Sequence, residues 1–380
     1  MQVPHSRCLQ SDHDSKGIVQ KKLFTPGPVP IHEHILAIGA TQPPYNRTSE
    51  FSQLTHEIVA GLKYVFQTSG QVALLTASGT LAMEATVLNF LTSSDRVIVI
   101  NGGTFGQRWC DICRIHAIEF REIKLEAGVD LDLDQLRETC IGETYTALLI
   151  NAHETSTGQL YDIQAIGKLA REFNLLFVVD AISTICADPF QMDDWNVDVG
   201  VLSSQKALAL PPGLSFVAIG PRALARSIEI APRTLYLNLQ DYLSNQERGQ
   251  LPYTPAIGLL LQLHQRLLDI QQHTLPMTVT DHALRASEFR QAMLDLPFSI
   301  LPARQSNAMT ALTCDDMDAV SVVQHLQTHC AIEVAPSGGA LKHRLIRISH
   351  MGAQSSSDTQ QMVSALAGTV QSQLSERSQL

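Results

Sequence analysis

From about residue 70 to residue 219, short apolar runs alternate with longer amphipathic stretches. The runs that we expect to form strands are Val72–Leu75, Val97–Ile100, Ala147–Ile150, Leu175–Val179, Val197–Leu202 and Ser215–Ala218. The stretches that we expect to form helices between them are Leu81–Leu91, Gln107–His116 and Ile163–Phe173. Strands that are apolar along their length and separated by helices are typical of a mostly parallel sheet covered on both faces. The pattern therefore predicts an α/β fold.

The pattern changes after about residue 255. Pro255–Gln272 has the apolar spacing of one long helix. Further helices near 278–296, 317–328 and 358–375 interleave with strands near 308–313 and 345–349. This mixture predicts a smaller α+β domain, to which the N-terminal segment contributes the first strand. We therefore predict a flexible leader at residues 1–22, a large domain at 23–255 whose N-terminal segment partly packs on the small domain, and a connecting helix with a small C-terminal domain at 256–380.

Charge and hydropathy exclude several classes of partner. The formal net charge is −10 at pH 7, whereas nucleic acids and anionic membranes bind basic faces. Residues 1–22 lack the apolar core of a signal peptide, and no later apolar run reaches the length of a membrane span. We therefore expect no nucleic-acid or membrane partner, and a cytoplasmic protein.

The seven cysteines are scattered along the chain and odd in number. This distribution is typical of buried thiols in a reducing compartment and not of a disulfide framework. Cys110 and Cys113 form one CxxC pair inside a helical stretch, but no second pair completes a zinc site, and the histidines show no ligand spacing. We therefore expect structural thiols and no metal ion.

Lys206 follows an apolar strand and stands in the sequence Leu-Ser-Ser-Gln-Lys, ahead of a Pro-Pro-Gly turn. A lysine at such a position is usually a solvated loop residue. If it projects into a cleft instead, partial desolvation lowers its pKa, and the amine can form a Schiff base with an aldehyde.

Two further motifs lie in the same predicted sheet. Asp180 ends the buried run Phe177–Val179, at the carboxyl edge where ligands of α/β proteins bind. Ser78, Gly79 and Thr80 follow a strand and open a helix, whose free N–H groups can hold a phosphate. Taken singly, these residues are equally well explained as ordinary helix caps.

In chain order, these motifs offer partners for the phosphate, the ring nitrogen and the aldehyde of pyridoxal 5'-phosphate (PLP). From Phe24 to Gly352 the chain resembles the class V aminotransferases of PLP fold type I, which include alanine–glyoxylate, serine–pyruvate and 2-aminoethylphosphonate transaminases. The string His153–Gly158, with the sequence His-Glu-Thr-Ser-Thr-Gly, is specific to that family. The resemblance implies a large domain with a mostly parallel seven-stranded sheet and a smaller α+β domain.

The resemblance also assigns roles to residues around the cofactor. Lys206 matches the Schiff-base lysine and Asp180 the partner of the pyridine nitrogen. Thr155 matches the residue that binds the phenolic oxygen, and Phe105 occupies the position of the aromatic ring that stacks on the cofactor. The matches to phosphate-binding residues are Ser78, Gly79, Thr80 and Gln205.

Other matches concern the substrate and a second subunit. Gly27, in a Thr-Pro-Gly-Pro turn, and Arg347 match residues beside the substrate, and the arginine of that position clamps the substrate carboxylate. Arg47 is a further candidate for contact with the substrate, although it could equally pair with Glu50. Thr254 resembles a residue that reaches the phosphate of the neighbouring subunit, which implies a homodimer.

The implied function is an aminotransferase that moves an amino group from a small amino acid or aminophosphonate to a 2-oxo acid such as pyruvate or glyoxylate. The alternative is a PLP-dependent lyase of the same fold, similar to a cysteine desulfurase. Those enzymes usually have histidines where Gln205 and Phe105 stand, and a catalytic cysteine in a mobile loop, whereas Cys314 and Cys330 lie in apolar surroundings. A non-catalytic protein of this fold is expected to have lost Lys206 or Asp180.

Overall fold

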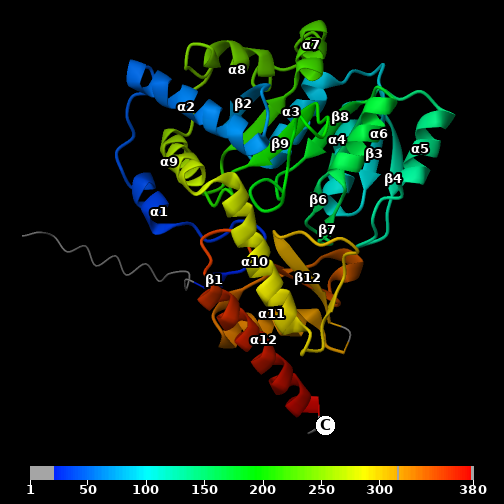
Figure 1. Ribbon diagram of the computed structural model, residues 1–380, viewed down its shortest axis with the longest axis vertical. Coiled ribbons are helices and arrows are strands. Elements are labelled where there is room, and N and C mark those ends of the chain that lie inside the picture. The colour runs from blue at the N-terminus through cyan, green and yellow to red at the C-terminus, as the bar shows by residue number, and fades with distance from the viewer. Residues whose placement is uncertain (1–20, 315, 378–380) are drawn as a thin grey trace, which may run out of the picture.

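A seven-stranded sheet forms the centre of the upper part of the molecule in Figure 1. The computed structural model describes residues 21–314 and 316–377. The strands stand in the order β2 (Gln71–Leu75), β10 (Ser215–Ile219), β9 (Val199–Ser203), β8 (Leu176–Asp180), β5 (Ala147–Asn151), β3 (Arg96–Asn101) and β4 (Glu119–Lys124). All neighbouring pairs are parallel except the two pairs that β10 makes, with β9 and β2. The predicted α/β fold with a mostly parallel sheet is confirmed.

The central strands are buried along their whole length, which requires cover on both faces. The helices of this part are α2 (Ser49–Phe66), α3 (Gly79–Phe90), α4 (Thr104–Ile115), α5 (Leu133–Gly142), α6 (Ile163–Glu172), α7 (Pro221–Glu229) and α8 (Leu239–Gln246). Local caps define where several of them begin. Thr48 accepts a hydrogen bond from the backbone of Phe51 at the start of α2, and Asp162 accepts one from Ala165 at the start of α6.

A second, antiparallel sheet forms the lower part of the molecule (Figure 1). Its strands stand in the order β11 (Ser299–Ile300), β12 (Met309–Thr313), β15 (Leu345–Ser349) and β14 (Ala335–Pro336). The helices α11 (Ala319–His329) and α12 (Ser356–Arg377) pack here around a separate apolar core. The N-terminal strand β1 (Lys22–Leu23) pairs in parallel with β13 (Ile332–Glu333), and Phe24 enters the same core.

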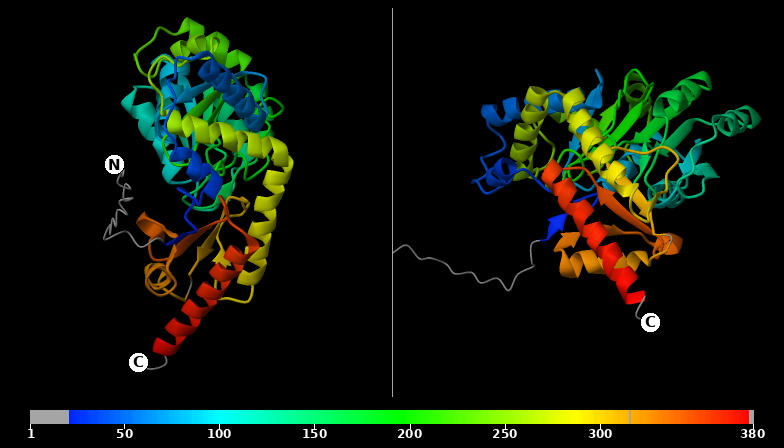
Figure 2. Two further views of the ribbon diagram at one scale, coloured as in Figure 1. Left: turned by 90° about the vertical axis from the view of Figure 1, so that its left-hand side faces the viewer. Right: turned by 60° about the horizontal axis from the view of Figure 1, so that its bottom comes forward.

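The two parts are joined by a pair of consecutive helices. α9 (Ile257–His273) packs on α1 (Glu33–Gly39) and α2, and contributes to the core of the large sheet. α10 (Leu275–Met293) runs from the upper to the lower part (Figure 2) and contributes Phe289 and Met293 to the lower core. The two helices meet at Thr274, whose φ of 72° breaks the helical path.

The predicted boundaries at residues 22 and 255 stay predictions. Residues 1–20 of the expected leader lie outside the described residues, whereas Lys22 belongs to β1. The buried apolar residues of α9 belong to the core of the large domain, whereas Phe289 and Met293 of α10 belong to the core of the small domain. The chain therefore passes from one core to the other along α10. Within the described ranges, no helix is long and apolar enough to cross a membrane.

Candidate active site

The carboxyl ends of the parallel strands bring the predicted polar residues to one edge of the large sheet. Asp180 is the last residue of β8, and Lys206 follows the end of β9 by three residues. Asn151 ends β5 and is paired with Asp180, and the turn after β2 leads through Ser78 into α3. Since ligands of open α/β sheets bind beyond the carboxyl ends of the strands, this edge is the candidate active site.

Lys206 lies at this edge as a buried amine, only 9% exposed. Burial is the main cause that lowers the pKa of Lys206 to about 8; the positive charges of Arg347 and Arg108 act in the same direction, and the carboxylate of Asp180 acts against it. The Nζ atom of Lys206 donates a hydrogen bond to the backbone carbonyl of Pro26. The side chain is therefore not a solvated loop lysine, and it supplies a neutral, nucleophilic amine at a pH not far above neutrality.

Gly27 lies directly against this lysine. Its φ of 130° is rarely adopted by residues with a side chain, and a methyl group there would lie 2.8 Å from Cδ and 2.9 Å from Nζ of Lys206. We expect Gly27→Ala to lower the free energy of unfolding by about 1–3 kcal/mol and to displace the amine from the carbonyl of Pro26. Thermal unfolding, together with the rate at which an amine reagent labels Lys206, checks both effects.

The matched control for this prediction is Gly142→Ala. Gly142 ends α5, is exposed, and a methyl group on it would meet no atom within 4 Å. The control is expected to leave the stability and the labelling rate at wild-type values. Equal labelling rates in Gly27→Ala and wild type would contradict the proposed contact between Gly27 and the amine.

Asp180 lies beside Lys206 as a buried carboxylate. Its Oδ1 accepts a hydrogen bond from the backbone N–H of Ile182 at 2.9 Å, and its Oδ2 accepts one from the side-chain amide of Asn151 at 2.6 Å. Burial raises the pKa of Asp180 to about 6, although both hydrogen bonds and the charge of Lys206 act against the shift. A carboxylate that is held in place but poorly solvated is suited to bind a protonated ring nitrogen.

The predicted phosphate loop is a helix start with close approaches. Ser78 is the N-cap of α3, yet its side chain makes no capping hydrogen bond. A methyl group on Gly79 would lie 2.4 Å from Cδ1 of Ile182, so a larger residue there would require the Ile182 side chain to shift. In the described part of the chain, the buried side-chain oxygens of Ser203 and Gln205 have no hydrogen-bond partner. Free helix N–H groups and unpartnered buried polar atoms fit a bound phosphate ester.

Phe105 lies in the first turn of α4, and a buried carboxylate fixes that turn. Glu154 accepts hydrogen bonds from the backbone N–H groups of Phe105 at 3.1 Å and Gly106 at 2.9 Å, and from the backbone N–H of Ser156 at 3.1 Å. An anion at a helix N-terminus is stabilised by the free N–H groups and the helix dipole. Glu154 therefore holds the ring-bearing turn beside the Thr155 segment, a role that the sequence interpretation missed.

Arg108 is a second residue that the sequence interpretation left without a role. It stands one helical turn after Phe105, and its guanidinium lies 4.8 Å from the centre of the Phe105 ring. Its Nη1 also donates a hydrogen bond to Oγ1 of Thr80 at 2.8 Å. Phe105 and Arg108 are three residues apart on one helix, and this spacing could have indicated from the sequence that their side chains meet. Arg108 thus ties the predicted stacking ring to the predicted phosphate loop.

Thr155 is buried and its hydroxyl lies 3.2 Å from the hydroxyl of Ser183. The same Ser183 hydroxyl lies 3.0 Å from Nδ1 of His153. Burial lowers the pKa of His153 to about 3, and the charge of Lys206 contributes to the shift. The imidazole is therefore neutral at physiological pH, and it acts as a hydrogen-bonding neighbour of Thr155 and Ser183.

Arg347 reaches the site from the small domain. It lies on β15, and it donates hydrogen bonds to the carbonyls of Thr155 at 3.0 Å and Pro336 at 2.8 Å. Its Nε is buried without a partner among the described residues, and burial lowers the pKa of the guanidinium. It lines a cleft of about 520 Å³ together with Phe105, Ser156 and Ser337. This cleft between the two domains offers a carboxylate access to Arg347.

Arg47 and Thr254 lie on the exposed surface of the large domain. The guanidinium of Arg47 donates hydrogen bonds to the side chain of Gln250 and to the carbonyl of Leu251, each at 3.0 Å. Arg47 is therefore anchored to the segment that leads to Thr254, and its described contacts do not include the predicted ion pair with Glu50. No hydrogen bond of the described residues joins Arg47 or Thr254 to Lys206, whereas Ala256, two residues after Thr254, donates a hydrogen bond to the side chain of Thr76 at 3.2 Å.

The cysteines within the described ranges are mostly buried thiols, with Cys330 half-buried. Burial raises the pKa of Cys110 and Cys113 to about 12, so their reactive thiolate forms are suppressed. No three His, Cys, Asp or Glu side chains gather as metal ligands in residues 21–314 and 316–377. Cys8 lies outside the described residues.

Comparisons with known proteins place these residues in context. Residues 39–340 match the family described as aminotransferase class-V. An L-aspartate–glyoxylate aminotransferase of Paracoccus denitrificans is 30% identical, over 88% of this chain and 87% of that protein. A protein of Synechococcus sp. named as the small subunit of a soluble hydrogenase is 32% identical, over 90% of this chain and 91% of that protein.

The fold has close structural counterparts as well. The crystal structure of an alanine–glyoxylate aminotransferase from Nostoc sp. superimposes with a TM-score of 0.89 and 26% sequence identity, covering 93% of this chain and 96% of that one. Since this coverage includes both domains, the similarity extends over the whole two-domain fold.

Proposed function

This chain belongs to the class V aminotransferases, and from that premise we propose that it binds PLP at Lys206. We propose that it moves an amino group from a small amino acid or aminophosphonate to a 2-oxo acid such as pyruvate or glyoxylate. The observation that carries the proposal is the buried amine of Lys206, with its pKa lowered to about 8, beside the carboxylate of Asp180 at one sheet edge. Aminotransferase chemistry needs both groups together.

The residues that would hold the cofactor surround this amine. Lys206 would bind its aldehyde carbon, Asp180 its ring nitrogen and Thr155 its phenolic oxygen. Phe105 would cover one face of the ring, and the phosphate would be bound by Ser78, Gly79, Thr80 and Gln205. The unpartnered buried atoms of Ser203, Gln205 and Asn151 support this assignment, because each lies on or next to one of these positions. When bound, PLP supplies an electron sink for the charge that develops at the substrate Cα.

The chain's own side chains supply binding and proton transfer. Arg347 binds the donor carboxylate, which orients the Cα–H bond. The amine of Lys206 would be the base that takes the Cα proton of the donor and later returns it. The carbonyl of Pro26, which already accepts a hydrogen bond from this amine, keeps it inside the site. The donor would leave as a 2-oxo acid, with oxygen from water in place of its amino group, and a second 2-oxo acid would take up that amino group and release water in the reverse sequence.

A homodimer is part of the proposal. Thr254 and Arg47 are exposed and lie on neighbouring segments, so both are accessible to a second subunit. Thr254 would contribute to the phosphate site of that subunit. The mass of the protein in solution, compared with that of a single chain, tests this part.

The half-reactions provide the direct test of the proposed activity. The cofactor-loaded protein is mixed with a panel of donors, which includes alanine, serine, aspartate and 2-aminoethylphosphonate, and the visible absorbance of the cofactor is followed. Loss of the band with at least one donor, and its recovery on adding pyruvate or glyoxylate, is the expected result. Persistence of the band with every donor would reject amino transfer, and sulfide release from cysteine would point to the lyase instead.

No observation favours that lyase as a second candidate. Cys314 is 3% exposed, and Cys330 packs partly against the lower core, so neither lies in the cleft that Arg347 lines. The hydrogenase name of the Synechococcus relative is not carried over, because Lys206, Asp180 and Arg347 form a set suited to amino transfer.

The lowered pKa of Lys206 predicts a pH dependence for cofactor capture by the apoprotein. Only the neutral amine attacks an aldehyde. With a pKa of about 8, about half of Lys206 is neutral at pH 8, whereas an ordinary lysine with a pKa of ~10.4 is neutral to less than about 1%. The capture rate should therefore rise with pH and level off above about 8, as measured by stopped-flow absorbance. A rate that keeps rising to pH 10 would show an unshifted amine.

A further inference from the structure

We propose that Asp188 is a positioning residue that fixes the small domain, and with it Arg347, relative to Lys206 and Asp180. Asp188 lies in the loop after β8 and is a buried carboxylate, 3% exposed. Its Oδ1 accepts a hydrogen bond from the backbone N–H of Asn307 at 2.8 Å, and its Oδ2 accepts one from the hydroxyl of Ser306. Both partners belong to the segment that leads directly into β12.

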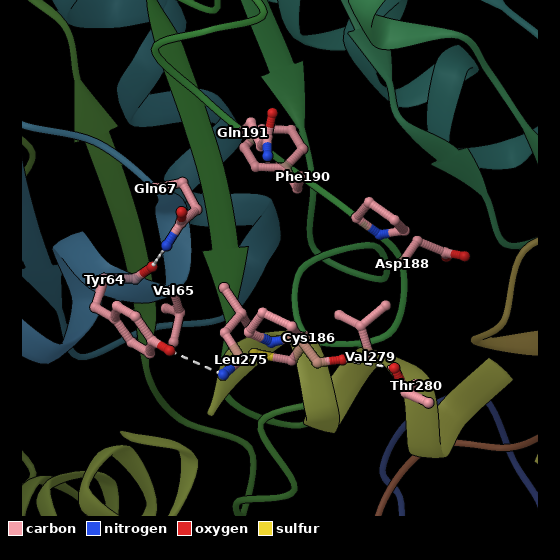
Figure 3. A pocket seen from close by; sticks show the side chains of 12 residues that line it. Tyr64, Val65, Gln67, Cys186, Asp188, Phe190, Gln191, Leu275, Val279 and Thr280 are labelled. Atoms are coloured by element: carbon pink, nitrogen blue, oxygen red, sulfur yellow. Dashed lines mark hydrogen bonds between the residues drawn. The ribbon is translucent and has the colours of Figure 1, made fainter. Parts of the chain in front are cut away.

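Asp188 borders a cavity, but both of its carboxylate oxygens already accept hydrogen bonds from the segment before β12. A cavity of about 460 Å³ is lined by the end of α2, the loop 186–191 and the start of α10. Figure 3 shows the carboxyl group of Asp188 turned away from the other lining side chains, such as Tyr64, Cys186 and Leu275. Its hydrogen bonds to Ser306 and Asn307 instead join two domains whose apolar cores are separate. Burial raises the pKa of Asp188 to about 6, in keeping with this enclosed position.

The segment that Asp188 binds is held along the large domain before it enters the small one. Ala303 donates a backbone hydrogen bond to Gly128 at 2.9 Å, and Arg304 accepts one from Leu160 at 3.0 Å. Asp188 then fixes the last residues before β12. Asp188 makes these contacts with its side chain, so they can be removed by substitution without changing the backbone; Arg304 also pairs through its side chain with Asp130 and Asp162, but these ion pairs are partly exposed.

From Ser306 the polar contacts continue to the strand beside Arg347. Arg290 of α10 donates to the carbonyl of Ser306 and, at 3.0 Å, to the hydroxyl of Thr310 on β12. That hydroxyl lies 2.8 Å from Nε2 of His350, which follows the end of β15. In the same pair of strands, Ala311 is the direct partner of Arg347. The strand next to Arg347 is therefore anchored at one end to the large domain through Asp188.

In the large domain, the loop that carries Asp188 begins at the end of β8, the strand whose last residue is Asp180. Asp180 and Asp188 are eight residues apart, and the turn between them includes Ile182, which hydrogen-bonds to Asp180, and Ser183, which hydrogen-bonds to Thr155. One short turn thus carries the carboxylate for the ring nitrogen at its start and the anchor of the small domain at its end. A shift of about 1 Å between such groups can cost about 10²-fold in rate, so loss of the anchor should be measurable.

The inference rests on the proposed function, because it assigns the effect to the binding of a donor carboxylate by Arg347. The test uses Asp188→Ala, Ser306→Ala and the milder Asp188→Asn in the cofactor-loaded full chain. Half-reactions are measured with alanine and with 1-phenylethylamine, an amine that has no carboxylate. We expect KM for alanine to rise about 10- to 100-fold in Asp188→Ala, with a smaller rise in the other two variants, and the reaction of 1-phenylethylamine to change less than about twofold.

Asp198→Ala is the matched control. Asp198 is also a buried carboxylate that accepts a backbone hydrogen bond, from Phe177 at 2.8 Å. It lies just before β9, at the amino-terminal ends of the parallel strands and so away from the site, and it pairs with Arg222. It is expected to lower stability and to slow both donors equally. Asp188 variants that also slow both donors equally, or that leave KM for alanine unchanged, would overturn the proposal.

Hydrogen exchange gives a readout that is independent of the activity. In Asp188→Ala the amides of β12 and β15 are expected to exchange faster than in wild type, while those of β5 and β8 keep their rates. Unchanged exchange in β12 and β15 would contradict the anchoring role whatever the enzyme does. If wild type and Arg347→Ala react alike with alanine, the proposed function fails, and the exchange result still decides whether Asp188 is an anchor.

Discussion

Replacing Lys206 by alanine is expected to lower the rate of amino transfer by about 10⁴-fold, because one residue supplies both the attachment of the cofactor and the proton transfer at the substrate Cα. Lys206→Arg is expected to fall as far, since a guanidinium stays protonated at physiological pH and cannot attack an aldehyde. The measurement is the single-turnover rate with the best donor, taken together with the absorbance of the bound cofactor.

Stability separates this effect from misfolding. Lys206 is buried and burial already lowers its pKa, so its charged form is poorly solvated in the fold. Lys206→Met keeps most of the aliphatic stem and removes the amine. We expect its apoprotein to melt at the wild-type temperature or above it. Wild-type turnover in any Lys206 variant would contradict the proposed role, whereas a large fall in melting temperature would assign the loss to the fold.

Replacing Asp180 by asparagine is expected to lower the rate by about 10²–10³-fold, because a neutral amide cannot keep a ring nitrogen protonated. The substitution suits the local hydrogen bonds. The new Oδ1 can still accept from Ile182, and when the side-chain amide of Asn151 turns over, its Oδ1, unpartnered in the described structure, can accept from the new amide. The loss therefore reports the missing charge. The measurement is kcat with the best donor, and Asp198→Asn, on the opposite edge of the sheet, serves as the control.

Asp180→Asn is also expected to make the apoprotein more stable than wild type at neutral pH. Burial raises the pKa of Asp180 from its ordinary value of 3.8 to about 6, so ionisation opposes folding of the apoprotein above pH 6. This cost is fully present above pH 6 and disappears below the unfolded value of 3.8. Asp180→Asn should therefore melt higher than wild type at pH 7, and the difference should vanish near pH 3.5. A difference that is the same at both pH values would show an unshifted carboxyl group.

The fold of the large domain was predictable where strands are buried on both faces. The runs at Ala147–Ile150 and Leu175–Val179 became β5 and β8 with shifts of one residue at their ends. β4 was missed because it is the edge strand of the sheet, and Glu119–Lys124 carries charged residues on its exposed positions. α2 was missed as well, although Thr48 caps it and its buried residues recur at helical spacing.

The site was predictable only in part for a similar reason. Lys206 and Asp180 stand at the ends of apolar strands, and the topology of a parallel sheet brings such ends together. The contacts of Arg108 with Thr80, of Glu154 with Phe105 and of Asp188 with Ser306 join residues that are 28, 49 and 118 positions apart in the chain. No local spacing in the sequence marks these contacts, except the helical turn that separates Phe105 from Arg108.

The order of apolar strands and helices in the sequence determined the parallel sheet, and with it the edge where Asp180 and Lys206 meet. This followed because strand burial and side-chain period are local properties of the chain. Tertiary structure alone decided that Lys206 is a buried amine held by the carbonyl of Pro26, and that Arg347 reaches Thr155 from a second domain. Burial, and the pKa shifts that it causes, depend on segments that come together only in the folded chain.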